Sequence, residues 1–372
     1  MQTRDSIFTS SDLAVYLELI AVLEDIAQNI EIRDDFSIHH PDYKPLEIPA
    51  EAVARFQRMP EQIKQKFLSS QLCGFLYGIY YNGSMRSQFA LDAPADTLSL
   101  NLENNMLMGI DMAFFQRLHD ANCGEGYFSE GWLILKEEND PDDSLVVKNG
   151  GLRFHIQRER HLRAAERQAK VGDLVAIELP KNRLQNKFYV AIGNLGFSSP
   201  SKANILVRIY FNLTPEGSVA VMASLTQQLN QSRILFSFKA LYNPQRYHRF
   251  DSGVLYFDKA DYQDVSLILA TIYSEHRSHF GLEIPLFTKQ LAAGMSLAEE
   301  PDLKFAESES FGMNRCQIVT DGLLKAFYSG QDSSVERMSA ILSQFSAVGI
   351  DLRHPYLNCD SENIYYSLGL ID

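Results

Sequence analysis

Basic side chains on separate predicted strands and on one loop lie where they could bind an anion together. They are Arg153, His155, Arg208, Lys239 and Arg249. Like charges repel one another, so a cluster of this kind lowers stability unless a negative charge neutralises it. A phosphorylated ligand could supply that charge, because basic side chains form short, strong hydrogen bonds with phosphate oxygens. These residues therefore indicate a candidate anion site.

Carboxylates of the chain itself are the alternative source of negative charge. Asp251, or the region of Glu178, could neutralise the basic cluster, which would then be a structural feature only. The adjacent pair Glu299 and Glu300 is interpreted as surface or capping groups, because neighbouring side chains point in different directions. The residue types alone leave both alternatives open.

One reaction fits the first alternative: the elimination of phosphate from phosphoserine or phosphothreonine. It needs a base that takes the Cα proton, an acid that protonates the leaving oxygen, and cations that hold the phosphate. A lysine among arginines can act as the base, since like charges disfavour its charged form. A histidine beside phosphate can act as the acid, since the negative charge favours its protonated form.

Motifs of other common chemistries are missing from the sequence. Walker A, GxGxxG, HExxH and GxSxG patterns do not occur. The four cysteines are widely spaced and form no CxxC or Cys/His metal pattern: Cys73, Cys123, Cys316 and Cys359. We therefore expect no metal site and no cofactor.

The composition limits the class of partner. The 372 residues carry a net charge of −13, so the phosphate backbone of a nucleic acid would be repelled on average. The first residues lack the apolar core of a signal peptide, and no apolar run is long enough to span a bilayer. Sparse cysteine use fits a reducing compartment. We expect a cytoplasmic protein that binds neither nucleic acid nor membrane.

Residues 1–120 are predicted to form a helical lobe. Apolar residues at helical spacing favour four helices: one capped near Ser11, one over 50–59, one over 61–81, and one within 99–119. The segment 34–49 is rich in Pro and Asp and is predicted to be a loop.

Residues 121–372 are predicted to form an α+β domain with a mainly antiparallel sheet and C-terminal helices. In the segment 152–157, apolar residues alternate with Arg153, His155 and Gln157. This period of two predicts a half-buried strand whose polar side carries a guanidinium and an imidazole.

From residue 205 onward the order of predicted elements is strand, helix, strand, strand, helix, strand. This is a split β-α-β arrangement, in which both helices cover one face of an antiparallel sheet. In the strand that begins at Ile234, Lys239 lies on the face opposite to Phe236 and Phe238. Lys239 is therefore expected to share the uncovered face with Arg208 and Tyr210.

Several segments in the C-terminal two-thirds resemble the HopA-type type III effector family of plant-pathogenic bacteria. They are DSGVLYF at 251–257, FGLEIPLFTKQLAAGMSLAEE at 280–300 and SFGMNRCQIVTDGLLKAF at 310–327. GYFSEGW and FSFKALYNP are similar to a branch of the family that is common in cyanobacteria and actinobacteria. The resemblance covers about 200 residues, with the motifs in the family's order.

Relatives of this domain in the maturation of class V lanthipeptides and thioamide-containing peptides act as carbon–oxygen lyases. A separate kinase phosphorylates Ser or Thr of a precursor peptide, and the lyase then leaves dehydroalanine or dehydrobutyrine. A more distant likeness is to effector phosphothreonine lyases, whose Lys-x-His strand is similar to Arg153-Phe154-His155 here. The arginine departs from that pattern but keeps a cation for the phosphate.

The resemblance implies a role for each candidate residue. His155 is the acid, Lys239 is the base, and the phosphate-binding cations are Arg153, Arg208 and Arg249. Lys187 competes with Lys239 for the role of base. Tyr210 and Tyr247 are further hydrogen-bond donors.

Two hypotheses follow. The first is a phosphopeptide lyase that serves the maturation of a ribosomal peptide natural product, with a phosphorylated precursor peptide and a separate Ser/Thr peptide kinase as partners. The second is a protein without catalysis, either a HopA-like effector or a protein that binds a kinase or peptide. Formation of a dehydrated residue distinguishes them.

Overall fold

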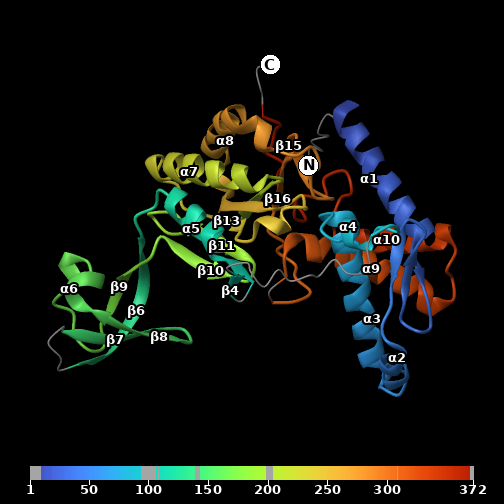
Figure 1. The fold of residues 1–372 in the computed structure, drawn as a ribbon, viewed down its shortest axis with the longest axis horizontal. Coiled ribbons are helices and arrows are strands. Elements are labelled where there is room, and N and C mark those ends of the chain that lie inside the picture. The colour runs from blue at the N-terminus through green and yellow to red at the C-terminus, as the bar shows by residue number, and fades with distance from the viewer. Residues whose placement is uncertain are drawn as a thin grey trace, which may run out of the picture.

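A seven-stranded sheet, in which every pairing is antiparallel, forms the centre of the computed structural model (Figure 1). The structure describes residues 10–93, 106–107, 109–138, 143–197, 204–307 and 309–368. The strands follow the order β10-β11-β13-β14-β12-β16-β15. Their bounds are β10 (Asn182–Gln185), β11 (Phe188–Ile192), β12 (Leu206–Phe211), β13 (Phe236–Leu241), β14 (Gly253–Asp258), β15 (Lys289–Ala292) and β16 (Met295–Glu299).

The predicted split β-α-β core is confirmed at the middle of this sheet. Helix α7 (Pro215–Gln231) connects β12 to β13, and α8 (Tyr262–His276) follows β14. The four central strands lie in the order β13-β14-β12-β16, which is the arrangement of two interlocked β-α-β units. Thr214 caps α7, since its hydroxyl accepts a hydrogen bond from the Gly217 amide at 3.0 Å.

The two faces of the sheet differ in character. On one face Phe236, Phe238 and Phe257 are fully buried, and α7 and α8 cover them. Each such side chain stabilises the fold by about 1.5–3 kcal/mol relative to an exposed one. The period of two places Lys239 and Tyr256 on the opposite face. The predicted orientation of Lys239 is therefore confirmed.

Helices from both ends of the chain lie beside the sheet (Figure 1), and Tyr77, Tyr81 and Ser310 from this region reach its polar face. The helices are α1 (Ser10–Asn29), α2 (Ala50–Gln57), α3 (Glu61–Leu76), α4 (Arg86–Phe89), α9 (Phe311–Ser329) and α10 (Ser334–Ala347), and α3 continues into a π-helical turn, Tyr77–Tyr81. A Cβ at Gly312 would lie 2.3 Å from the Tyr81 ring, so glycine allows this turn to approach the start of α9. Residues of these helices and of the sheet share one buried apolar cluster.

The N-terminal part differs from the prediction in two places. Segment 34–49 is not only a loop, because β2 (Ile38–His40) and β3 (Tyr43–Leu46) form a small antiparallel sheet with β1 (Glu31–Ile32). Strands of two to four residues are too short to give a period of two. Within 99–119, helix α5 (Met112–Ala121) begins only at Met112, after two short strands, β4 (Met106–Leu107) and β5 (Ile110–Asp111). Residues 94–105 and 108 lie outside the described part of the chain.

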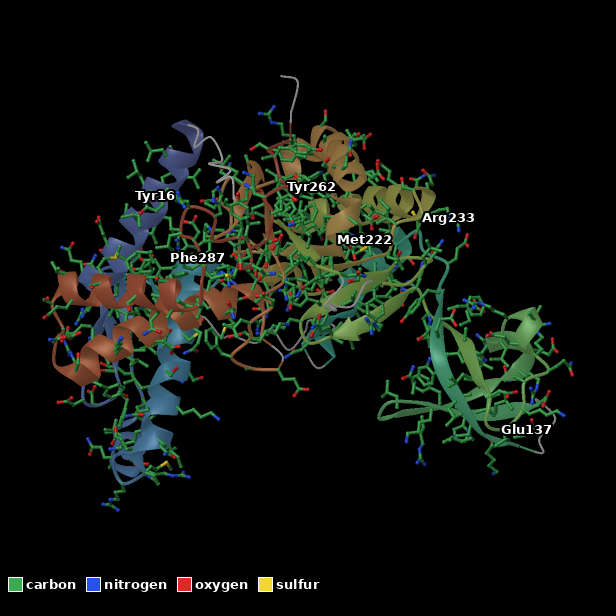
Figure 2. The ribbon with its side chains drawn as sticks, turned by 180° about the vertical axis from the view of Figure 1, so that it is seen from behind. Tyr16, Glu137, Met222, Arg233, Tyr262 and Phe287 are labelled. Atoms are coloured by element: carbon green, nitrogen blue, oxygen red, sulfur yellow. The ribbon has the colours of Figure 1, made fainter. Side chains whose placement is uncertain are left out.

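A four-stranded antiparallel sheet forms a separate body. It has the order β8-β7-β6-β9 and the bounds β6 (Tyr127–Glu137), β7 (Ser144–Asn149), β8 (Leu152–Gln157) and β9 (Leu174–Leu179), with a short helix α6 (Arg158–His161). Its apolar core, which includes Trp132, is distinct from that of the seven-stranded sheet. Figure 2 shows Glu137 in this body, far from Met222 and Tyr262. The domain boundary near residue 120 stays a prediction.

This second sheet corrects one expectation. Arg153 and His155 belong to β8, so they do not meet Lys239 on one sheet face. Strand β8 is also more exposed than predicted: Leu152 and Phe154 are exposed, and Ile156 is buried. Alternation within a strand shows which residues share a face, but it does not show which sheet the strand joins.

No helix in the described ranges is both long and apolar enough to cross a bilayer. The described residues also contain no group of three or more His, Cys, Asp or Glu side chains that could hold a metal ion.

Candidate active site

Two adjoining cavities open on the polar face of the seven-stranded sheet, and we call them the inner and outer cavities. The inner one, of about 60 Å³, is lined by Tyr77, Tyr81, Phe188, Arg208, Tyr210, Lys239, Arg249, Asp251, Val254 and Ser310. The outer one, of about 480 Å³, is lined by Arg183, Leu184, Gln185, Val190, Phe197, Leu206, Arg208, Ser237, Lys239, Tyr256 and Glu300. Arg208 and Lys239 line both cavities, so they lie where the two meet.

Strand register explains why these residues converge. Antiparallel pairing aligns Arg208 with Tyr256, and Tyr256 with Ser237, in one row across the sheet. The next row on the same face contains Tyr210, Val254 and Lys239. The predicted grouping of Lys239 with Arg208 and Tyr210 is therefore confirmed.

Arg208 is buried and has a carboxylate partner. The residue is 7% exposed, and its Nε and Nη2 both contact a carboxylate oxygen of Glu300. Lys304 also binds Glu300, at 2.5 Å. The interpretation of Glu300 as a surface or capping group is therefore wrong, since it is only 7% exposed and neutralises a buried arginine.

Arg249 has a partner of its own, Asp251. Its Nη2 lies 2.8 Å from Asp251 Oδ2, and its Nε contacts Oδ1 of the same carboxylate. Burial alone would raise the pKa of Asp251, but the charge and hydrogen bonds of Arg249, together with the charge of Lys239, outweigh burial and hold that pKa below its ordinary value. The suggested neutralisation by Asp251 is thus present, while Glu178 is exposed on β9.

A pH dependence of stability follows from this pair. Because the folded-state pKa of Asp251 lies below the ordinary value of 3.8, its contribution is complete above that value and is lost as the pH falls through the lower pKa. We expect the free energy of unfolding of the wild type to exceed that of Asp251→Asn at about pH 6, with the difference shrinking towards about pH 3. Urea unfolding at several pH values measures this. A difference that is independent of pH would contradict the assignment.

Lys239 differs from the two arginines. Its Nζ lies 4.7 Å from the ring centroid of Phe188 and 5.1 Å from that of Tyr256. Within the described part of the chain, no carboxylate forms a salt bridge with it. Arg208 and Arg249 each form a salt bridge with a carboxylate, whereas the half-buried Lys239 forms none, so its positive charge is available to a ligand in the cleft.

Neutral groups of the inner cavity also favour an anion. Tyr210 is 3% exposed, and its hydroxyl has no hydrogen-bond partner in the described structure. Ser310 caps the N-terminus of the 19-residue helix α9, where the helix dipole is positive. A buried hydroxyl without a partner is costly, so its presence beside these cations points to a bound polar group. An oxyanion of a few atoms suits the cavity.

Tyr256 was not singled out from the sequence. Burial would raise its pKa, but the positive charges of Lys239 and Arg208 outweigh burial, and the pKa lies below its ordinary value. The sequence nevertheless contains a pattern that indicates the orientation of Tyr256. Tyr256 alternates with Leu255 and Phe257 on β14, which predicts that it points away from the helices.

Two other candidates lie outside the cleft. The Tyr247 hydroxyl lies 2.8 Å from both the Leu241 carbonyl and the Ser218 hydroxyl, so it fastens a loop to α7. Lys187 is exposed at the turn between β10 and β11, where its φ of 71° is in the left-handed region. Neither residue lines either cavity.

Arg153 and His155 are also distant from the cleft. Both are exposed on β8, and the His155 side chain is 69% exposed. Its Nδ1 lies 3.3 Å from Glu138 Oε2 in the same small sheet. The structure thus brings together Arg208, Lys239, Arg249 and Tyr210, and it leaves Arg153 and His155 apart from them.

Comparisons with known proteins agree with the resemblance seen in the sequence. A profile of the HopA1 effector protein family matches residues 179–357. This segment contains every residue of both cavities except Tyr77 and Tyr81, and it excludes Arg153 and His155. No curated protein sequence matches the chain.

Two solved structures are similar in outline. The effector protein of Pseudomonas syringae pv. tomato strain DC3000 is 16% identical, with a TM-score of 0.43 and coverage of 94% of this chain and 98% of that one. The effector protein of Pseudomonas syringae pv. syringae strain 61 is 12% identical, with a TM-score of 0.44 and coverage of 95% and 99%.

Proposed function

We propose that this chain, whose residues 179–357 match the profile of the HopA1 effector protein family, is a phosphopeptide lyase. It eliminates phosphate from phosphoserine or phosphothreonine and leaves dehydroalanine or dehydrobutyrine. One observation carries the proposal: the inner cavity joins Lys239, which has no carboxylate partner, to two arginines and to the partnerless hydroxyl of Tyr210.

The sizes of the two cavities suit a phosphorylated side chain on a peptide. The inner cavity takes the phosphate, where Arg208, Arg249 and Lys239 can contact its oxygens. The outer cavity, several times larger, takes the peptide backbone beside the phosphorylated residue. Lys239 lines both cavities, so in this arrangement it lies between the phosphate and the peptide backbone, where it can exchange a proton with the substrate.

The substrate in this proposal is a precursor peptide that a separate Ser/Thr peptide kinase has phosphorylated, in the maturation of a ribosomal peptide natural product. No cofactor is needed, because the elimination requires only proton transfer and charge stabilisation. His155 is not assigned as the acid, since it lies on another sheet.

A second candidate is binding without catalysis, as in an effector or a protein that holds a kinase or peptide. The observation that favours it is the pairing of both arginines. Arg208 with Glu300 and Arg249 with Asp251 already form neutral pairs, so the cluster is stable without phosphate. The uncompensated charge of Lys239 favours the lyase.

Inorganic phosphate release from a phosphothreonine peptide separates the two candidates. We expect the wild type to bind the phosphorylated peptide more tightly than the unphosphorylated one, because phosphate complements the positive inner cavity, and to release phosphate from it. Phosphate release is followed by a coupled colour assay and affinity by calorimetry. Affinity without release would support binding alone, and equal affinity for both peptides would contradict both candidates.

A further inference from the structure

Tyr256 lies between two cationic side chains of the cleft, Lys239 and Arg208. Lys239 Nζ and Arg208 Cζ each lie 5.1 Å from the centroid of its ring. The side chain is half-buried and lines the outer cavity, whereas Lys239 and Arg208 line both cavities. The phosphate-binding side chains therefore lie on the inner side of the cleft, and the phenol of Tyr256 lies on its outer side.

We propose that Tyr256 is the base that takes the Cα proton and that Lys239 is the acid that protonates the leaving phosphate. This assignment rests on the proposed lyase function and reverses the role that the family resemblance gave to Lys239. It also fills the position of acid that His155 cannot occupy from its separate sheet.

The positions of Tyr256 and Lys239 relative to the two cavities determine which is the base and which is the acid. With the phosphate in the inner cavity, the Cα atom of the substrate lies towards the outer cavity, which Tyr256 lines. Lys239 lies between the two and has no carboxylate partner, so its ammonium group is available to the oxygen that leaves with the phosphate. An ammonium group beside the leaving oxygen can donate a proton to it as the Cβ–O bond breaks, which is the role of the acid.

The charges around Tyr256 favour its ionised form. Burial and the carboxylate of Glu300 oppose ionisation, but the positive charges of Lys239 and Arg208 outweigh them, and the pKa of Tyr256 lies below its ordinary value. A phenolate between two cations can accept a proton near neutral pH more readily than an ordinary tyrosine.

The elimination balances with these two groups alone. The Tyr256 phenolate takes the Cα proton and becomes a phenol, and the electron pair of the C–H bond forms the Cα=Cβ double bond. The Cβ–O bond breaks, and the leaving oxygen takes a proton from the Lys239 ammonium, so hydrogen phosphate dianion departs. A proton then passes from the Tyr256 phenol to the Lys239 amine, and both groups return to their starting states.

A sulfated peptide distinguishes the base from the acid. Sulfate has the same tetrahedral shape as phosphate but is a much weaker base, so it leaves without being protonated. A peptide carrying O-sulfothreonine therefore needs the base but not the acid. Tyr256→Phe keeps the ring beneath both cations, and Lys239→Met keeps a chain of similar length. Tyr328→Phe is the matched control, since it removes the same hydroxyl at a residue that is 45% exposed and outside both cavities.

The expected result is a different pattern for each variant. Tyr256→Phe loses elimination of both phosphate and sulfate by about 10²–10⁴-fold, and Lys239→Met loses phosphate elimination to that extent but keeps most of its sulfate elimination. Tyr328→Phe keeps both. Retained activity of Tyr256→Phe, loss of both reactions in Lys239→Met, or a wild type that eliminates phosphate but not sulfate would overturn this assignment alone. A wild type that eliminates nothing would overturn the lyase function and the assignment together.

Discussion

Lys239→Met is expected to lose phosphate elimination by about 10²–10⁴-fold, the usual contribution of a positioned proton-transfer group. The side chain lies where the inner and outer cavities meet, so no other ammonium group in the described cleft can take over its contact with the leaving group. The fold should survive, because the lysine contributes two cation–π contacts of about 0.5–2 kcal/mol each and no buried ion pair. Single-turnover rates with a phosphothreonine peptide measure the effect, and circular dichroism checks the fold.

Lys187→Met is the matched control for this variant. It removes the same charge from the lysine that competes for the role by resemblance, but from an exposed turn outside both cavities. His155→Ala is a second control, since that imidazole lies on the four-stranded sheet. Both variants should keep wild-type rates. Loss of activity in either of them, with full activity in Lys239→Met, would move the site away from this cleft.

Glu299→Ala is expected to lower the free energy of unfolding by about 3–5 kcal/mol, the usual effect of removing one partner from a buried ion pair. Glu299 is 0% exposed, and its carboxylate lies 2.9 Å from both Lys259 Nζ and the Tyr365 hydroxyl. It also accepts hydrogen bonds from the Asn358 amide at 3.0 Å and the Ser361 hydroxyl at 2.8 Å. One carboxylate thus fastens the C-terminal segment to the end of β16.

Urea unfolding and limited proteolysis measure this second effect. Besides the shift in the unfolding midpoint, we expect faster cleavage within 358–366, because that segment loses its buried anchor. Glu275→Ala removes the same group from an exposed position on α8 and should change stability by less than about 0.5 kcal/mol. Equal stability of the two variants would show that the buried carboxylate is not the anchor.

The strands that form the cleft could be predicted because each signal is local. The period of two around Phe236 and Phe238 places Lys239 on the other face, and the same pattern holds around Arg208 on β12. The split β-α-β order then brings these strands together in one sheet. Tyr256 could have been found by the same argument applied to β14.

The buried ion pairs of the carboxylates, and the sheet to which the strand of Arg153 and His155 belongs, could not be predicted from local patterns. Glu300 meets Arg208 across 92 residues of sequence, a contact that no local pattern encodes. Because Glu299 and Glu300 are adjacent in sequence, both were expected to lie at the surface. Both are buried, because each has a different cation beside it. Arg153 and His155 have the right residue types and alternation, but their strand pairs with β7 in another sheet.

The most direct test of the lyase account is the mass of a phosphothreonine peptide after incubation with the purified wild-type protein. Elimination removes phosphoric acid and leaves dehydrobutyrine, whereas hydrolysis would leave threonine. We expect the dehydrated product with the wild type and the intact phosphopeptide with Lys239→Met. An intact phosphopeptide with the wild type as well, even when the precursor has been phosphorylated by a kinase encoded beside this protein, would contradict the account.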